Sequence, residues 1–305
     1  MKKVISRFSI ILLAALTLLV PDIVFAGEAL KVDPKQPVFA TGVELGRKVL
    51  VKGAARPGKP PKVAPTAATG VLGTEASSNR YAIVVGISNY PGNANDLQYC
   101  DDDAADVVSA LKGVYGFQTA NIIVKYNLDA TRQNIIDAIR SIKSQAKSPD
   151  DEVLFYFSGH GGRGKASDGD AEATDECIWA HNKASLVPIW DGELAAEFSG
   201  FGTSRIVFIF DSCYAGGMTD LAGSGRVVAM ASNENSLSYE YSSIGNGEFT
   251  YWMVEKGMTG SLADRFDQKD GVYDVTVEEA WDYARANCVY DSVNLSDRFT
   301  DDLLL

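Results

Sequence analysis

VLFYFSGHGGRG, residues 153–164, is the stretch that decides the fold. Its first five residues form the continuous apolar run expected of a buried parallel strand. The run stops at Ser158, and His160, one of only two histidines in the chain, follows among glycines. Glycine permits tight turns and close approach, and histidine titrates nearest to neutral pH. The stretch indicates either a strand that presents a proton-transfer group at its C-terminal end or a structural histidine in a turn.

Similar apolar runs alternate with amphipathic segments along the rest of the chain. We expect strands at 80–88, 121–127, 152–161, 204–213 and 226–232, and helices at 101–116, 131–146, 190–200, 247–258 and 276–288. This alternation predicts an α/β fold, with a mainly parallel central sheet and helices on both faces. Sites in such sheets form beyond the C-terminal ends of the strands, where His160 is expected.

Composition excludes some classes of partner. The 305 residues are 46% hydrophobic and 22% charged, which is ordinary for a globular protein. The net charge of −12 argues against nucleic acid as a partner. A surplus of carboxylates suits metal ions or peptides rich in lysine and arginine, and it also serves plain solubility.

The N-terminal residues 1–26 have the pattern of a signal peptide. A basic start, a short apolar run and the small-x-small sequence before Gly27 predict cleavage and export rather than a membrane span. Removing three basic residues and one acid takes the charge from −12 to −14. Residues 27–79 follow as a flexible leader with Pro, Gly, Lys and Arg and no sustained period, and residues 80–305 form the predicted domain.

The leader is the one basic region of an acidic protein. It is either a solvated spacer or a segment that lies across an acidic site on its own domain. The chain also has four cysteines, Cys100, Cys177, Cys213 and Cys288. In an exported protein this number suggests disulfides, but the sequence does not settle their pairing.

Cys213 ends the strand predicted at 204–213, in the sequence FIFDSCYAGG. If that strand lies beside the strand that ends before His160, the thiol and the imidazole face each other across one crevice. Within hydrogen-bonding reach they would form a thiolate–imidazolium pair that attacks carbonyl carbon and then protonates the leaving amine. The alternative is a buried core thiol, the commonest fate of cysteine.

FYFSGHGG and FIFDSCYAGG resemble the His and Cys motifs of the caspase-like cysteine peptidases, and most closely those of metacaspases and bacterial caspase-like proteins. The resemblance covers residues 80–260 and implies a caspase-hemoglobinase fold with a Cys–His dyad. It implies His160 and Cys213 as the catalytic residues, with the backbone N–H groups of Gly161 and Cys213 as the oxyanion hole. It requires no cofactor for the chemistry.

The resemblance also bears on specificity, because metacaspases cut after Arg or Lys and place acids in the pocket. It implies Asp211, Asp103 and Ser158 as substrate-binding residues. Two carboxylates beside the thiol would hold a guanidinium by charge-assisted bonds and repel an acidic side chain. Asp103 also belongs to a run of acids that suits a helix N-terminus. The alternatives are an Asp-specific peptidase and a non-catalytic binding module of the same fold.

Many metacaspases need calcium, which makes Ca²⁺ an expected activator. The resemblance implies Asp175, Asp191 and Asp220 as its ligands, and backbone carbonyls and water would complete the coordination. The alternative is an acidic solvated loop. We interpret His181, which lacks metal-ligand spacing, as structural.

The expected partners are protein or peptide substrates with Arg or Lys before the scissile bond. We expect no nucleic acid, no membrane-spanning segment and a monomer. A peptidase of this specificity carries its own substrates, so we expect the leader to occupy or shield the cleft and to be removed by self-cleavage. The candidate sites are Arg47, Lys48, Lys52, Arg56, Lys59, Lys62 and, between the catalytic strands, Lys183.

Overall fold

The structure is a computed structural model of the chain. It describes residues 30–33, 36–38, 40–52, 64–169, 172–264 and 274–305. The predicted signal peptide, residues 1–26, lies outside the described residues, as do Arg56, Lys59 and Lys62 of the leader. No helix within the described ranges is long and apolar enough to cross a membrane.

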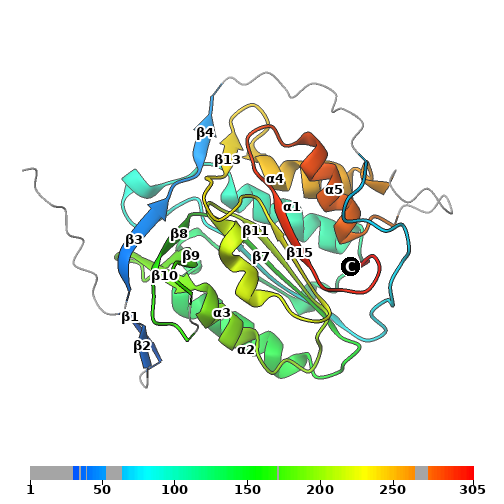
Figure 1. Ribbon diagram of the computed structural model, residues 1–305, viewed down its shortest axis with the longest axis horizontal. Coiled ribbons are helices and arrows are strands. Elements are labelled where there is room, and N and C mark those ends of the chain that lie inside the picture. The colour runs from blue at the N-terminus through cyan, green and yellow to red at the C-terminus, as the bar shows by residue number, and fades with distance from the viewer. Residues whose placement is uncertain (1–29, 34–35, 39, 53–63, 170–171, 265–273) are drawn as a thin grey trace, which may run out of the picture.

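A six-stranded sheet forms the centre of the molecule (Figure 1). Five neighbouring strands are parallel, and β15 closes one edge in the antiparallel direction. In spatial order the strands are β15 (Asn294–Asp297), β12 (Arg226–Met230), β11 (Ile206–Asp211), β7 (Glu152–Ser158), β5 (Arg80–Gly86) and β6 (Ile122–Tyr126). Their continuous burial explains why the sequence of β5, β7 and β11 is apolar without alternation.

Helices cover both faces of this sheet, as the sequence predicted (Figure 1). One face packs against α2 (Arg132–Gln145) and α3 (Asp191–Phe198), and the other against α1 (Cys100–Gly113), the π-helix η5 (Tyr251–Thr259) and α5 (Val277–Asn287). Thr131 caps α2, because its side chain accepts the N–H of Asn134 at 3.2 Å. Short elements complete the described fold: the 3-10 turns η1 (Asn93–Asn95), η2 (Thr119–Asn121), η3 (Asn127–Asp129) and η4 (Ala215–Leu221), and the single turn α4 (Glu248–Thr250).

The register of the two central strands decides where the functional groups lie. Ser158, the last residue of β7, pairs directly with Asp211, the last residue of β11. His160 and Cys213 each follow two residues later, so the two motifs emerge side by side at the C-terminal edge of the sheet. The strand neighbours that the sequence analysis required are therefore present.

The leader has more structure than its sequence indicated. It contains β1 (Leu30–Asp33), β2 (Gln36–Val38), β3 (Thr41–Gly46) and β4 (Val49–Val51). Within the domain, β3 joins a second sheet with β8 (Gly161–Lys165), β9 (Asp175–His181) and β10 (Leu186–Trp190), while β4 joins β13 (Tyr239–Tyr241) and β14 (Asn246–Gly247). The sequence of a short strand carries little signal of its own when the strands that pair with it lie far along the chain. The prediction of an unstructured leader is therefore wrong for these four strands.

Candidate active site

Cys213 and His160 are both buried at the end of the central sheet. Cys213 Sγ accepts the backbone N–H of Ser238 at 3.3 Å and lies 3.9 Å from the Ser238 hydroxyl. Gly161, which follows His160, contacts the Cys213 backbone so closely that a Cβ there would lie 1.8 Å from the Cys213 carbonyl oxygen. The position therefore requires glycine, and the predicted oxyanion-hole residues are in direct contact.

The hydrogen bonds of His160 fix its tautomer. Nε2 lies 2.8 Å from the carbonyl oxygen of Asn95, which only accepts, so Nε2 carries the proton. Nδ1 has no hydrogen-bond partner among the described residues and retains its lone pair. Tyr90 holds the residue in place: its hydroxyl accepts the His160 N–H at 3.0 Å, and its ring lies 4.8 Å from the imidazole. Nδ1 is thus the nitrogen that can accept a proton, and the backbone of Gly46 in the leader also acts on the ring and raises its pKa.

Both groups are uncharged at neutral pH in this conformation. Burial raises the pKa of Cys213 to about 11, against the opposing effect of the hydrogen bonds from Ser238. Burial lowers the pKa of His160 to about 4, and the charges of Arg47 and Lys48 act in the same direction. The structure therefore has a neutral thiol and a neutral imidazole where the sequence predicted an ion pair, because both groups are buried.

The three predicted substrate-binding residues line one pocket beside Cys213. The pocket is occupied by Lys48 of the leader, whose side chain is fully buried. Its Nζ lies 2.6 Å from Asp211 Oδ1, 3.0 Å from Ser158 Oγ and 3.6 Å from Asp103 Oδ2. Gly247 closes the pocket, since a Cβ there would lie 3.0 Å from Lys48 Nζ. The ammonium group thus donates a hydrogen bond to the Ser158 hydroxyl and forms ion pairs with two carboxylates.

The electrostatics of the pocket favour a cation. Burial alone would lower the pKa of Lys48, but the charges of Asp211 and Asp103 outweigh it and hold that pKa well above its usual value. The pKa of Asp103 is raised to about 7, chiefly by burial and further by Asp211. The two carboxylates are held by Gly247 N–H on Asp103 and by the N–H and hydroxyl of Thr250 on Asp211. A ligand without positive charge would leave them buried and unpaired.

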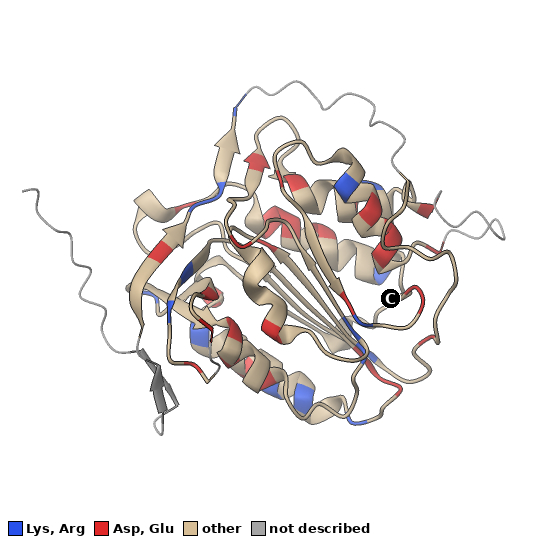
Figure 2. Ribbon diagram, in the orientation of Figure 1, with Lys and Arg blue, Asp and Glu red and all other residues tan. Residues whose placement is uncertain are grey.

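Two further groups of contacts hold the leader against the site. Glu44 accepts a hydrogen bond from the Tyr214 hydroxyl at 2.8 Å and pairs with Arg163 at 3.0 Å. Arg47 donates to the Ala94 carbonyl and to Asn95 Oδ1, beside the carbonyl that holds His160. The blue segment between β3 and β4 in Figure 2 is this Arg47–Lys48 pair.

A second acidic cluster lies near the start of α3. Carboxylate oxygens of Glu172, Glu176 and Asp191 lie within 4.8 Å of one another. The pKa of Asp191 is raised to about 9, first by burial and then by the charges of its neighbours, Asp220 among them. Asp175 lies beside the cluster and accepts the Ala166 N–H at 2.7 Å. The structure thus brings Asp191 and Asp220 together with Glu172 and Glu176, two residues that the sequence analysis did not select.

The donor set of this cluster fits a hard cation. It offers carboxylate oxygens from three residues that lie close together. Burial first, and then the charges of neighbouring acids, raise the pKa of Glu176 to about 8 and that of Asp191 to about 9. Oxygen ligands of this kind are those that calcium prefers. A divalent cation there would replace the protons and remove the repulsion.

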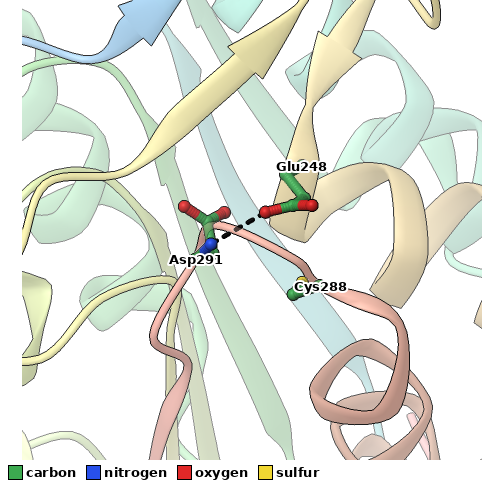
Figure 3. A group of neighbouring side chains, drawn as sticks. All are labelled: Glu248, Cys288 and Asp291. Carbon is green, nitrogen blue, oxygen red and sulfur yellow. Dashed lines mark hydrogen bonds between the residues drawn. The ribbon is translucent and has the colours of Figure 1, made fainter. Parts of the chain in front are cut away.

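Glu248, Cys288 and Asp291 form another close group, but its carboxylates serve the backbone (Figure 3). Glu248 accepts the N–H groups of Val289, Tyr290 and Asp291, each at 2.8 Å. Asp291 in turn accepts the N–H groups of Tyr239 at 3.0 Å and Phe249 at 3.1 Å. The group therefore fastens β13 and the start of α4 to the chain after α5.

His181 has a structural environment. Its Nε2 lies 2.9 Å from the Asn127 carbonyl, and its Nδ1 accepts the Lys183 N–H at 3.1 Å. All four cysteines lie within the described residues, and all are free thiols. Three residues that act on the site, Tyr90, Asn95 and Ser238, escaped the sequence analysis. Tyr90 and Ser238 lie in loops, and Asn95 ends the 3-10 turn η1. The only available signal was a single tyrosine in the turn-rich sequence SNYPGNAN.

The comparisons agree with this geometry. The model of the peptidase C14 family, described as the caspase domain, matches residues 79–279. A chain with a Cys and a His at neighbouring strand ends of such a domain has the architecture of a cysteine-type endopeptidase. The protein belongs to the caspase-domain family.

Metacaspase-1 proteins of fungi are among its relatives. The chain is 33% identical to Metacaspase-1 of Schizosaccharomyces pombe over 154 residues, which cover 47% of this chain and 35% of the relative. It is 30% identical to Metacaspase-1 of Saccharomyces cerevisiae over 158 residues, or 48% and 36% of the two chains. For Metacaspase-1 of Candida glabrata the values are 31% over 161 residues, 48% and 40%. The match thus spans less than half of each relative.

Proposed function

We propose that the protein is a cysteine endopeptidase that hydrolyses peptide bonds on the carboxyl side of lysine and arginine. One observation carries this proposal: a lysine of the chain itself, Lys48, fills the pocket beside Cys213 and pairs with Asp211 at 2.6 Å. A buried pocket that holds an ammonium group against two carboxylates and a hydroxyl is a built cation site. An aspartate substrate would bring a third carboxylate into it and be repelled.

The geometry supports acyl transfer by the two residues at the strand ends. Cys213 Sγ attacks the substrate carbonyl carbon as its proton passes to Nδ1 of His160, the nitrogen with the free lone pair. The oxyanion is stabilised by the N–H groups of Gly161 and Cys213. The imidazolium then protonates the leaving amine, and water hydrolyses the thioester while His160 removes its proton. Tyr90 and Asn95 position the imidazole throughout.

Calcium fits the acidic cluster at α3 as an activator. Glu172, Glu176 and Asp191 would supply carboxylate oxygens, with Asp220 nearby and Asp175 beside them. The cluster is connected to the catalytic loop, because Glu176 packs against Gly217, whose Cβ would lie 1.7 Å from Glu176 Oε2. An ion at this cluster would fix the position of the turn η4 that follows Cys213.

The remaining parts of the proposal concern control and location. The leader shields the site until it is displaced or cut, which makes the protein a zymogen that processes itself. The N-terminal sequence supports export, and we propose that the protein acts as a monomer outside the cytoplasm. Retention of full-length protein with residues 1–26 in the cytosolic fraction would contradict this location.

The activity is tested with fluorogenic peptides that carry Arg, Lys or Asp before the leaving group, with and without Ca²⁺. We expect turnover of the Arg and Lys peptides only. Cys213→Ala and His160→Ala should each lower kcat/KM on the order of 10³-fold or more, while the melting temperature stays within a few degrees. Turnover of the Asp peptide would show a different specificity, and absence of all turnover would favour a binding module.

A further inference from the structure

The leader crosses the candidate site along a defined path. On the way in, β3 pairs with β8 in the antiparallel direction, and Gly46 stands opposite Gly161. A Cβ on Gly46 would lie 2.6 Å from the Cβ of Cys213, so the leader backbone touches the nucleophile. Arg47 then contacts Asn95, the residue that holds His160. The chain before Lys48 therefore lies on the His160 side of Cys213.

The chain after Lys48 leaves on the opposite side. The Val49 N–H donates to the Ser238 carbonyl at 3.0 Å, and Ser238 flanks Cys213 through its own N–H on Sγ. From Val49 to Val51 the leader runs parallel to β13. The leader therefore lies beside His160 before Lys48 and beside Ser238 after Lys48.

A peptide that is cut after the residue in the pocket must run through the site in the opposite direction to the leader. The nitrogen that follows this residue is the leaving group, and the imidazole must reach it to donate a proton. The residues that follow must then lie on the His160 side, and those that precede must lie along β13. In the structure, the backbone nitrogen of Val49 donates its hydrogen bond to the Ser238 carbonyl instead. The residues before Lys48 occupy the His160 side.

We propose that the leader binds the site in the reverse direction to a substrate, so that Lys48 fills the specificity pocket without its following bond being cut. The inference rests on the proposed function, since Lys48 blocks the same pocket that substrate side chains would enter. The leader is then an internal competitive inhibitor. Because it is tethered beside the site, its effective concentration is high, and it competes with substrate without being consumed.

The first test maps self-cleavage by mass spectrometry of the intact chain over a range of protein concentrations. We expect that the closed molecule does not cut its own Lys48–Val49 bond. A fragment that begins at Val49 should therefore not form at a rate that is independent of protein concentration. Such a fragment would indicate cleavage of Lys48–Val49 within the closed molecule and would overturn the reverse direction. Cuts after other basic residues, or a cut after Lys48 that accelerates with concentration, agree with it, since released leaders are substrates for other molecules.

The second test uses Val49→Pro, for which the two directions predict opposite results. Proline removes the N–H that bonds to Ser238, so a reversed leader binds more weakly and peptide turnover rises about tenfold. If activation instead required cleavage of Lys48–Val49, proline after the scissile bond would block it and turnover would fall. A fall would therefore overturn the inference.

Two more variants release the leader by other means. Lys48→Met removes the charge from the pocket, and Gly46→Ala places a methyl group against Cys213. Both should raise kcat/KM for Arg and Lys peptides about tenfold or more, whereas Lys112→Met, at an exposed position of α1, should leave it unchanged. If Lys48→Met and Lys112→Met are equally active, the leader does not inhibit. If no variant cuts any basic peptide, the proposed function itself fails.

Discussion

At the scale of single residues, the protonation of Cys213 and His160 is the feature that most distinguishes this conformation from a working one. A thiol with a pKa of about 11 and an imidazole with a pKa of about 4 are both neutral at pH 7. Attack then requires the proton to pass from Sγ to Nδ1 in the reaction itself. Removing the leader would hydrate both groups and take the charges of Arg47 and Lys48 away from His160, which favours the imidazolium.

This difference is measurable through alkylation of Cys213 by iodoacetamide, since only the thiolate reacts. Burial raises the pKa of Cys213 to about 11. The thiolate fraction in the closed protein is therefore about one in a thousand at pH 8, and it grows with pH. We expect the alkylation rate of the Cys213 peptide to rise about tenfold per pH unit up to pH 10. Lys48→Met removes a charge that lowers the pKa of Cys213, but burial is the larger effect on that pKa. Displacement of the leader in this variant should therefore shift the midpoint to lower pH. A midpoint near pH 11 in both proteins would contradict the role of the leader in burying the thiol.

The two pocket carboxylates are not equivalent. Asp211 lies 2.6 Å from Lys48 Nζ, whereas Asp103 lies 3.6 Å away and acts partly through the Ser158 hydroxyl, which donates to it at 2.7 Å. In the Lys48→Met background, Asp211→Asn should lower kcat/KM for a Lys peptide about 30-fold or more, which corresponds to about 2 kcal/mol. The loss should come mainly from a higher KM. Asp103→Asn should have a smaller effect and the exposed Asp102→Asn none. Equal losses at Asp211 and Asp103 would contradict this order.

At the scale of secondary-structure elements, the sequence was sufficient for the parts of the fold whose signal is local. β5, β7 and β11 are buried on both faces, so their apolar runs were unambiguous. Helix α2 displays its apolar stripe and its Thr131 cap in the sequence. The glycine-rich ends of β7 and β11 indicated His160 and Cys213 for the same reason: polar, turn-forming residues end an apolar strand.

The leader strands and the loop residues could not be found this way, because their structure depends on distant partners. β3 pairs with β8 more than a hundred residues away, and β4 pairs with β13 almost two hundred residues away. Tyr90 and Ser238 act through a hydroxyl and a backbone N–H, which carry no sequence pattern. The basic character of the leader did indicate an acidic partner, but not which lysine meets it or in which direction.

At the scale of the whole molecule, two clusters of acidic side chains have different partners. The pocket at Asp211 is neutralised by Lys48 from the same chain. At the cluster around Glu172, Glu176 and Asp191, the pKa of two of the acids is raised to about 8 and 9 by burial and by like charges. The first site is thus filled by a lysine of the leader, whereas the carboxylate oxygens of the second fit a hard cation.

Calcium binding at the second cluster is best tested without reference to activity. In the Cys213→Ala protein, which cannot process itself, Ca²⁺ at a hundred times its Kd should stabilise the fold by about 2.7 kcal/mol. For a domain of this size we expect the melting temperature to rise by several degrees. Asp191→Asn should abolish the rise, because it removes a buried carboxylate at the centre of the cluster. Asp150→Asn, which alters an exposed carboxylate, should leave the rise intact. An equal rise in both variants would place calcium elsewhere on the molecule, and no rise in the parent would mean that the cluster holds protons rather than an ion.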